Sequence, residues 1–197
     1  MANIDAPRGF RPIAGLSGAP YNGATIKCVL LAAQGTALFR GDPVTLTGTG
    51  SSDGYAYPSV GRAAASSTNF HGVVVSFDPD PNDLTLQHRT ASTLRVCNVV
   101  PALPGQLFVI QADGDFAITD IGETVDVNAG TGDTTTGLSA MELDSSNIGT
   151  GLNLLIWGID PRPDNSLADS GTNADIIVSF NEGFVNASSV ASSDIGI

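Results

Sequence analysis

Short apolar segments, separated by turn residues at intervals of about ten positions, run along most of the chain. Such segments are typical of antiparallel β structure, and few stretches show the period of a helix. The pattern therefore predicts an all-β fold, an antiparallel β-sandwich or barrel, and leaves open whether the topology is a jelly roll, β-tulip-like or another sandwich. The expected strands lie near residues 25–33, 38–47, 71–78, 94–100, 107–111, 115–119, 123–127, 138–143, 152–157 and 175–181.

Turn-forming residues mark the connections between these strands. Residues 48–54, 78–83 and 128–136 have the composition of loops. The pair Asp113-Gly114 stands between the apolar runs LFVIQ and DFAIT, which predicts a hairpin whose turn needs positive φ.

Residues 1–25 (MANIDAPRGFRPIAGLSGAPYNGAT) follow neither period and carry frequent prolines and glycines, which disfavour a regular strand ladder. They read as an extended N-terminal arm with apolar and cationic anchors. The arm could pack on the chain's own core or lie on another subunit, and we favour the second. The candidate partner-binding residues are Ile4, Arg8, Phe10, Arg11, Ile13 and Tyr21.

The rest of the chain divides into a body and a tail. Residues 26–185 form the predicted β-rich body, with a possible join of two β layers near 99–104 (VVPALP). Residues 186–197 (NASSVASSDIGI) are small and polar and are expected to form a flexible C-terminal tail. A chain of 197 residues is long enough to bury a sizeable core without disulfides or metals.

Charge is distributed unevenly along the chain. Residues 1–99 carry seven Lys or Arg against six Asp or Glu, whereas residues 100–197 carry one against fourteen. This asymmetry suggests a nearly neutral part that docks and an acidic part that faces solvent. Nucleic acid and anionic membranes are unfavourable partners, because phosphate binding needs clustered Lys and Arg.

Candidate catalytic and metal-binding patterns are weak. The two histidines, His71 and His88, have no spaced nucleophile or carboxylate partner, so we expect a non-enzymatic protein without catalytic residues or a cofactor. Acidic residues recur in 78–83 and 113–126 and could suggest calcium, but neither run fits a calcium-binding loop. We interpret them as solvated turn acids and assign no metal ligand.

The two cysteines, Cys28 and Cys97, both lie in apolar, strand-like stretches without metal or redox spacing. We expect small buried hydrophobic residues, although a disulfide is possible on count alone. The start MANIDAP lacks the features of a signal peptide, which favours synthesis in a reducing cytoplasm. No apolar run is long enough to cross a bilayer.

Several segments carry a resemblance: NIDAPRGFRPI, LSGAPYNGAT, LFRGDPVTL, the strand near 71–77, and the closing LNLLIWGID and ADIIVSFNEG. Together they resemble the head decoration, or cement, proteins of tailed bacteriophages, which are encoded beside the major capsid protein. The resemblance implies an all-β protein that forms a small cyclic oligomer, often a homotrimer, and clamps adjacent subunits of the major capsid protein. It also implies a place on the outer capsid surface of the virion, after synthesis in the bacterial host cytoplasm.

The function expected from the residues and the resemblance is therefore capsid stabilisation, with the arm in grooves of the shell. The alternative is a tail- or fibre-associated virion protein or a host-glycan-binding surface module. Sugars could then stack on Trp157, Tyr55 and Tyr57. The apolar run LLIWGID, however, predicts that Trp157 is a core residue of a strand. A hydrolase that uses an Asp/Glu pair is a third hypothesis.

Overall fold

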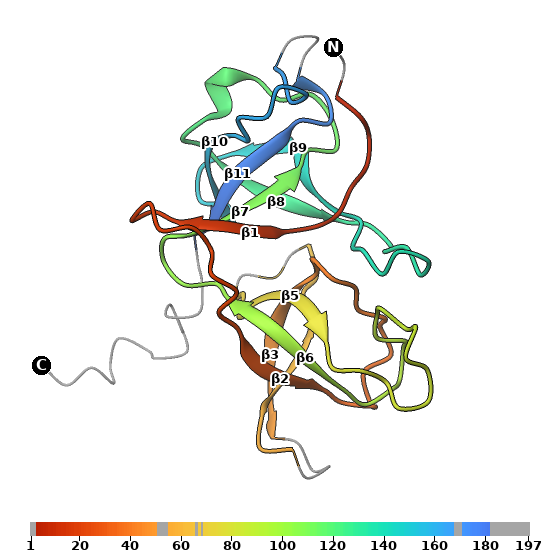
Figure 1. Ribbon diagram of the computed structural model, residues 1–197. Helices are drawn as coiled ribbons and strands as arrows, with labels where there is room; N and C mark the ends of the chain where they lie inside the picture. Colours follow the sequence, from red (N-terminus) through yellow and green to blue (C-terminus); the bar gives the residue numbers. More distant parts are fainter. Residues whose placement is uncertain (1–2, 51–54, 66, 68, 168–170, 182–197) are drawn as a thin grey trace, which may run out of the picture.

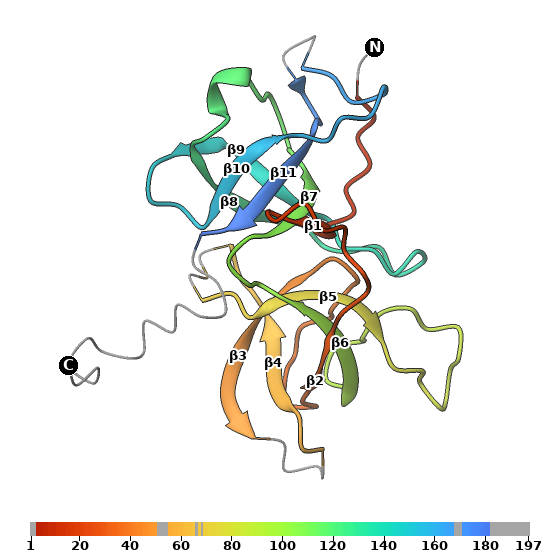
Figure 2. The same cartoon turned by 60° about the vertical axis from the view of Figure 1, so that its left-hand side comes forward.

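The computed structural model describes residues 3–50, 55–65, 67, 69–167 and 171–181 (Figures 1 and 2). It is 44% strand and 2% helical, which confirms the antiparallel all-β prediction, and of the architectures left open a barrel is present. The proposed tail 186–197 lies outside the described residues. The elements are β1 (Arg11–Gly15), β2 (Ile26–Leu30), β3 (Pro43–Gly50), β4 (Pro58–Arg62), β5 (Gly72–Phe77), β6 (Arg95–Pro101), β7 (Gln106–Gln111), the 3-10 turn η1 (Ile118–Asp120), β8 (Thr124–Ala129), β9 (Met141–Gly149), β10 (Leu154–Ile159) and β11 (Asp175–Phe180).

The first unit is a closed barrel with the strand order β2-β4-β3-β5-β6, in the lower half of Figure 1. Cys28 of β2 lies directly opposite Cys97 of β6, and both thiols are free and fully buried, as predicted. Burial raises the pKa of Cys28 to about 11, so this thiol stays protonated and inert at neutral pH. The barrel interior is filled by Cys28, Leu30, Leu38, Val44, Val60, Val74, Cys97 and Val99.

The second unit is a six-stranded sheet with the order β1-β7-β11-β10-β8-β9, in the upper half of Figure 1. An isolated bridge between Ala112 and Leu143 brings the residue after β7 next to β9, so the sheet curls back on itself. Its inner face is a continuous apolar surface, as alternating side chains in a half-buried sheet require. The chain passes from the barrel to this sheet over residues 102–105, beside the join expected near 99–104.

The N-terminal segment differs from the sequence-based expectation. Residues 11–15 form a regular strand, β1, which pairs antiparallel with β7 and contains a bulge between Pro12 and Ala14. β1 lies at the boundary of the two units in both views (Figures 1 and 2). The expectation that prolines and glycines exclude a ladder was wrong here, because β1 is the edge strand of the sheet and edge strands tolerate proline.

Four phenylalanines meet at the boundary between the units. Phe180, the last residue of β11, stacks on Phe10 at 5.2 Å between ring centroids and packs on Phe70 at 4.9 Å. Phe108 of β7 meets the same ring edge-on at 5.3 Å. The four rings come from the N-terminal segment, the barrel side and the sheet, so one core joins all three.

A buried ion pair of the barrel unit lies at the same boundary. The carboxylate of Asp42 is fully buried and accepts hydrogen bonds from Arg62 at 3.1 and 3.2 Å, from the Ser139 hydroxyl at 2.6 Å and from the Phe39 amide at 2.9 Å. Burial raises the pKa of Asp42, and Arg62, Ser139 and the Phe39 amide oppose that rise. Arg62 also donates to the Gly130 carbonyl, so the pair ties the barrel to the connection between β8 and β9.

The hairpin predicted at Asp113-Gly114 does not form, and residues 115–119 are not a strand. The Asp113 carboxylate instead accepts hydrogen bonds from the backbone and hydroxyl of Ser145, at 2.9 and 2.8 Å, and from Asn128. The chain then continues into η1. Contacts with distant parts of the chain therefore outweigh the local turn preference.

Two further differences concern single elements. β4, with the sequence PSVGR, was not predicted, because its apolar run is too short to show a period. Trp157 does lie in a strand, β10, but its side chain is 43% exposed, so its assignment to the core was wrong. The register of β10 against β11 shifts between Ile156 and Gly158, and such bulges redirect a side chain.

We expect the Asp42–Arg62 pair to be required for stability. Asp42→Ala should lower the free energy of unfolding by about 3–5 kcal/mol, because it removes a fully buried carboxylate and leaves the partly buried Arg62 without its counter-charge. Combining it with Arg62→Met should cost less than the sum of the two single changes. Urea unfolding measures all three. Lys27→Ala, which breaks the exposed Lys27–Asp78 pair, is the control and should change little; an equally small effect of Asp42→Ala would contradict the assigned role.

Candidate functional site

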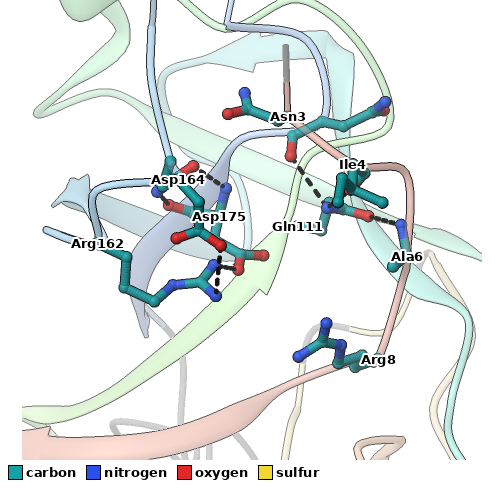
Figure 3. Close-up of a pocket in the computed structure, with 10 residues that line it drawn as sticks. Asn3, Ile4, Ala6, Arg8, Gln111, Arg162, Asp164 and Asp175 are labelled. Carbon is teal, nitrogen blue, oxygen red and sulfur yellow. Dashed lines mark hydrogen bonds and ion pairs between the residues drawn. The ribbon is translucent and has the colours of Figure 1, made fainter. Parts of the chain in front are cut away.

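The N-terminal segment lies on the sheet unit and borders a pocket of about 120 Å³ (Figure 3). Its first described residue, Asn3, donates to the carbonyls of Ser166 and Thr172 at 2.9 and 2.8 Å. The Asn3 side-chain oxygen accepts from the Ser166 amide at 2.9 Å. These three bonds hold the beginning of the segment against the connection between β10 and β11.

Gln111, the buried last residue of β7, holds the next part of the segment. Its side-chain oxygen accepts from the Ala6 amide at 2.9 Å, and its amide nitrogen donates to the carbonyls of Ile4 at 2.9 Å and Asn173 at 3.0 Å. Figure 3 shows the bonds to the segment as dashed lines on either side of Ile4. One glutamine thus replaces a strand partner for residues that have no ladder of their own.

A shared carboxylate closes the opposite wall of the pocket. Asp175 of β11 forms ion pairs with Arg162 and, at 3.2 Å, with Arg11 of β1. Arg162 also pairs with Asp160 at 2.7 Å. Arg11 is therefore engaged within the chain, and only part of its charge is available to a partner.

Arg8 differs from every other cation of the chain. It is exposed and lines both this pocket and a neighbouring hollow of about 190 Å³ beside Phe10 and Val75. Within the part of the chain that the structure describes, Arg8 makes no hydrogen bond or ion pair, and Figure 3 shows it apart from Arg162 and Asp175. The other seven of the eight Lys and Arg side chains donate to groups of the same chain: Arg11, Lys27, Arg40, Arg62, Arg89, Arg95 and Arg162.

The predicted partner-binding residues fall into two groups. Ile4, at 79% exposure, and Arg8 face outward from the segment. Phe10 is buried in the core, and Tyr21 packs against that core from the edge. Ile13 is half-buried in the bulge of β1. Only Ile4 and Arg8 are thus both exposed and unengaged among the described contacts.

The segments APRGFRP and GDPV, which carry the resemblance, meet in space. The Phe10 amide donates to the Gly41 carbonyl at 3.0 Å, and a Cβ built on Gly9 would lie 2.5 Å from that same oxygen. Gly9 and Gly41 also adopt φ of +64° and +95°, which glycine tolerates best. These motif residues therefore position the segment, and Asp42 of GDPV is the buried carboxylate at the unit boundary.

The histidines and acids that could suggest catalysis lie elsewhere. Burial lowers the pKa of both His71 and His88, and the His88 ring stacks on Phe39 at 5.0 Å. Neither histidine lines the pocket. Asp80 and Asp83 accept hydrogen bonds from their own turns. Among the residues described here, no three His, Cys, Asp or Glu side chains lie close enough to hold a metal ion.

No family model, curated protein or solved structure matched this chain. In the described ranges, no helix is long and apolar enough to span a membrane. The sequence analysis did not identify the residues that fix the site, namely Asn3, Gln111, Arg162 and Asp175. A glutamine that ends an apolar run was the only available signal.

Replacing Gln111 should loosen the N-terminal segment without unfolding the protein. Gln111→Leu keeps the side-chain volume but removes the partners of the Ala6 amide and the Ile4 and Asn173 carbonyls. Hydrogen exchange of the peptide covering residues 3–8 should become at least several-fold faster. The control is Gln87→Leu, at an exposed position. Unchanged exchange in the Gln111 variant would show that other contacts hold the segment.

Proposed function

We propose that this chain is a non-enzymatic virion structural protein, a capsid decoration or cement protein of a tailed bacteriophage. It binds the outer head surface and clamps adjacent major capsid subunits, which stabilises the DNA-filled shell. The homotrimer and the capsid location implied by the resemblance belong to this proposal. The observation that carries it is the exposure of the Ile4 and Arg8 side chains, which make no hydrogen bond or ion pair among the described residues, on the segment that bears the resemblance.

The geometry favours a fixed docking surface over a free arm. Asn3 and Gln111 hold the segment on the sheet, so little conformational entropy is lost when Ile4 and Arg8 meet a partner. Burial of Ile4 contributes at roughly 25 cal/mol per Å² of apolar area. Arg8 can form a charge-assisted bond with a capsid carboxylate. Because many copies bind one shell, modest individual contacts sum to a large effect.

The distribution of charge agrees with this orientation. Arg89 donates to the carbonyls of Leu31, Gln34, Thr36 and Thr93. Its positive charge is therefore buried against the connections between barrel strands. Internal use of the cations leaves the surface more acidic than the net charge of −12 suggests. An acidic outer face would limit aggregation of free copies and adhesion between virions.

A glycan-binding module is the second candidate, favoured by one observation, the exposure of Trp157. Tyr55 and Tyr57 are also exposed and stack on each other at 6.3 Å. They precede β4 at the end of the barrel farthest from the sheet that holds β10 (Figure 2). The three rings therefore do not form one sugar-binding platform.

Cosedimentation with empty, expanded phage heads that lack the protein tests the proposal. Wild-type protein should saturate at a fixed ratio near one copy per capsid subunit. Arg8→Glu and Ile4→Asp should each weaken binding roughly tenfold, and Arg8→Glu should also reduce its salt dependence. Leu84→Asp is the matched control, since Leu84 is 80% exposed on the barrel, and it should bind like wild type.

Two outcomes would count against the proposal. Failure of folded wild-type protein to bind heads would reject decoration and favour tails, fibres or glycans. Normal occupancy of both variants at every salt concentration would reject the N-terminal surface as the contact. Deleting residues 2–21 is not a clean test, because it removes β1 and Phe10 and would damage the body.

A further inference from the structure

A second exposed apolar surface lies on η1 and β10 and is independent of Ile4 and Arg8. Its members, called the η1 patch, are Ile118, Ile121 and Trp157, which are 72%, 39% and 43% exposed. Ile118 is the first residue of η1 and Ile121 is its C-cap, whose amide donates to the Ile118 carbonyl at 3.4 Å, so the two side chains lie one turn apart on the same side. Exposed apolar side chains that gather in this way mark interaction surfaces.

Backbone pairing joins the turn to β10. The Gly122 amide donates to the Ile156 carbonyl, and the Ile156 amide donates to the Glu123 carbonyl, both at 3.0 Å. Gly122 and Glu123 therefore both pair with Ile156, as in a bulge, and the next residues along the two antiparallel chains are Ile121 and Trp157. Both views show η1 next to the β10 end of the sheet (Figures 1 and 2). The indole of Trp157 is fixed by its bond to the Ser179 hydroxyl at 2.9 Å.

Ile118 of the patch lines an open hollow of about 530 Å³, which has an apolar lining and two carboxylates, called the acidic rim. Phe116 and Leu167 form apolar parts of its wall, and Asp115 and Asp120 supply carboxylates. Glu123 follows on the strand side of the turn. Every charged side chain that lines the hollow is acidic.

We propose that the η1 patch binds a protein partner that places an apolar side chain on Ile118 and Trp157 and surrounds it with Lys or Arg. Burial of the apolar side chains supplies affinity, and the acidic rim selects a basic partner. A second copy fits poorly, because it brings the same carboxylates and its cations, apart from Arg8, are engaged internally. A sugar fits less well, because the indole N–H is already bonded to Ser179.

Trp157 is the single tryptophan, so its fluorescence reports directly on the patch. The probe is a capped hexapeptide of two leucines flanked on each side by two lysines. At low salt it should produce a saturable blue shift of Trp157 emission and protect the indole from acrylamide quenching. Added salt should weaken binding, because the rim contribution is electrostatic.

Variants that keep the reporter separate the two contributions. Ile118→Ser should weaken peptide binding roughly tenfold, and Glu123→Gln should weaken it less and flatten the salt dependence. Leu84→Ser, at an equally exposed position on the barrel, is the control and should leave binding unchanged. Thermal unfolding confirms that each variant is folded.

Three results would overturn the proposal. The first is equally tight binding of a peptide that carries glutamates in place of the lysines, which would show that the patch does not select a basic partner. A blue shift that grows with protein concentration alone and is lost in Arg8→Glu would identify a second copy as the occupant. A response to neutral oligosaccharides, lost in Ile118→Ser, with none to the basic peptide would identify a glycan site.

Discussion

The packing of Phe180 against Phe10, Phe70 and Phe108 is the contact on which the rest of the structure depends. The barrel interior alone is a cluster of eight small and medium-sized residues, and so small a core gives little stability by itself. The larger cluster extends from the sheet into the barrel side, so part of the buried apolar surface of each unit lies in one shared core. Stacked and edge-on rings add to that burial and fix the orientation of the N-terminal segment. The candidate site exists because this segment is held.

Much of the fold could be predicted from hydrophobic periodicity, because most strands have one buried face. β2, β5, β6, β7, β8, β10 and β11 lie near the predicted positions. The hairpin error is caused by contacts between distant residues. Ser145 and Asn128 occupy the Asp113 carboxylate, which cancels the local hairpin signal. β1 contains Pro12 and lies at a sheet edge, where a pattern of alternating side chains is not required.

The candidate site was only partly predictable. Ile4 and Arg8 were named because apolar and cationic residues stand out in a segment rich in proline and glycine. Gln111 lies 107 positions from Ile4, and no local pattern relates them. Trp157 shows a different limit, since an apolar run suggests burial while a bulge in β10 turns the indole outward. Such a one-residue shift in strand register cannot be predicted from the local sequence pattern.

The N-terminal segment also constrains the order in which the contacts of the molecule form during folding. Arg11 of β1 pairs with Val109, and the ring that covers Phe10 belongs to residue 180. The ring of Phe10 therefore stays uncovered until residue 180 has been synthesised. Contacts so distant in sequence form late, because the entropy of loop closure must be lost first. β1 can pair once β7 has been synthesised, but the sheet is complete only after β11 joins it between β7 and β10.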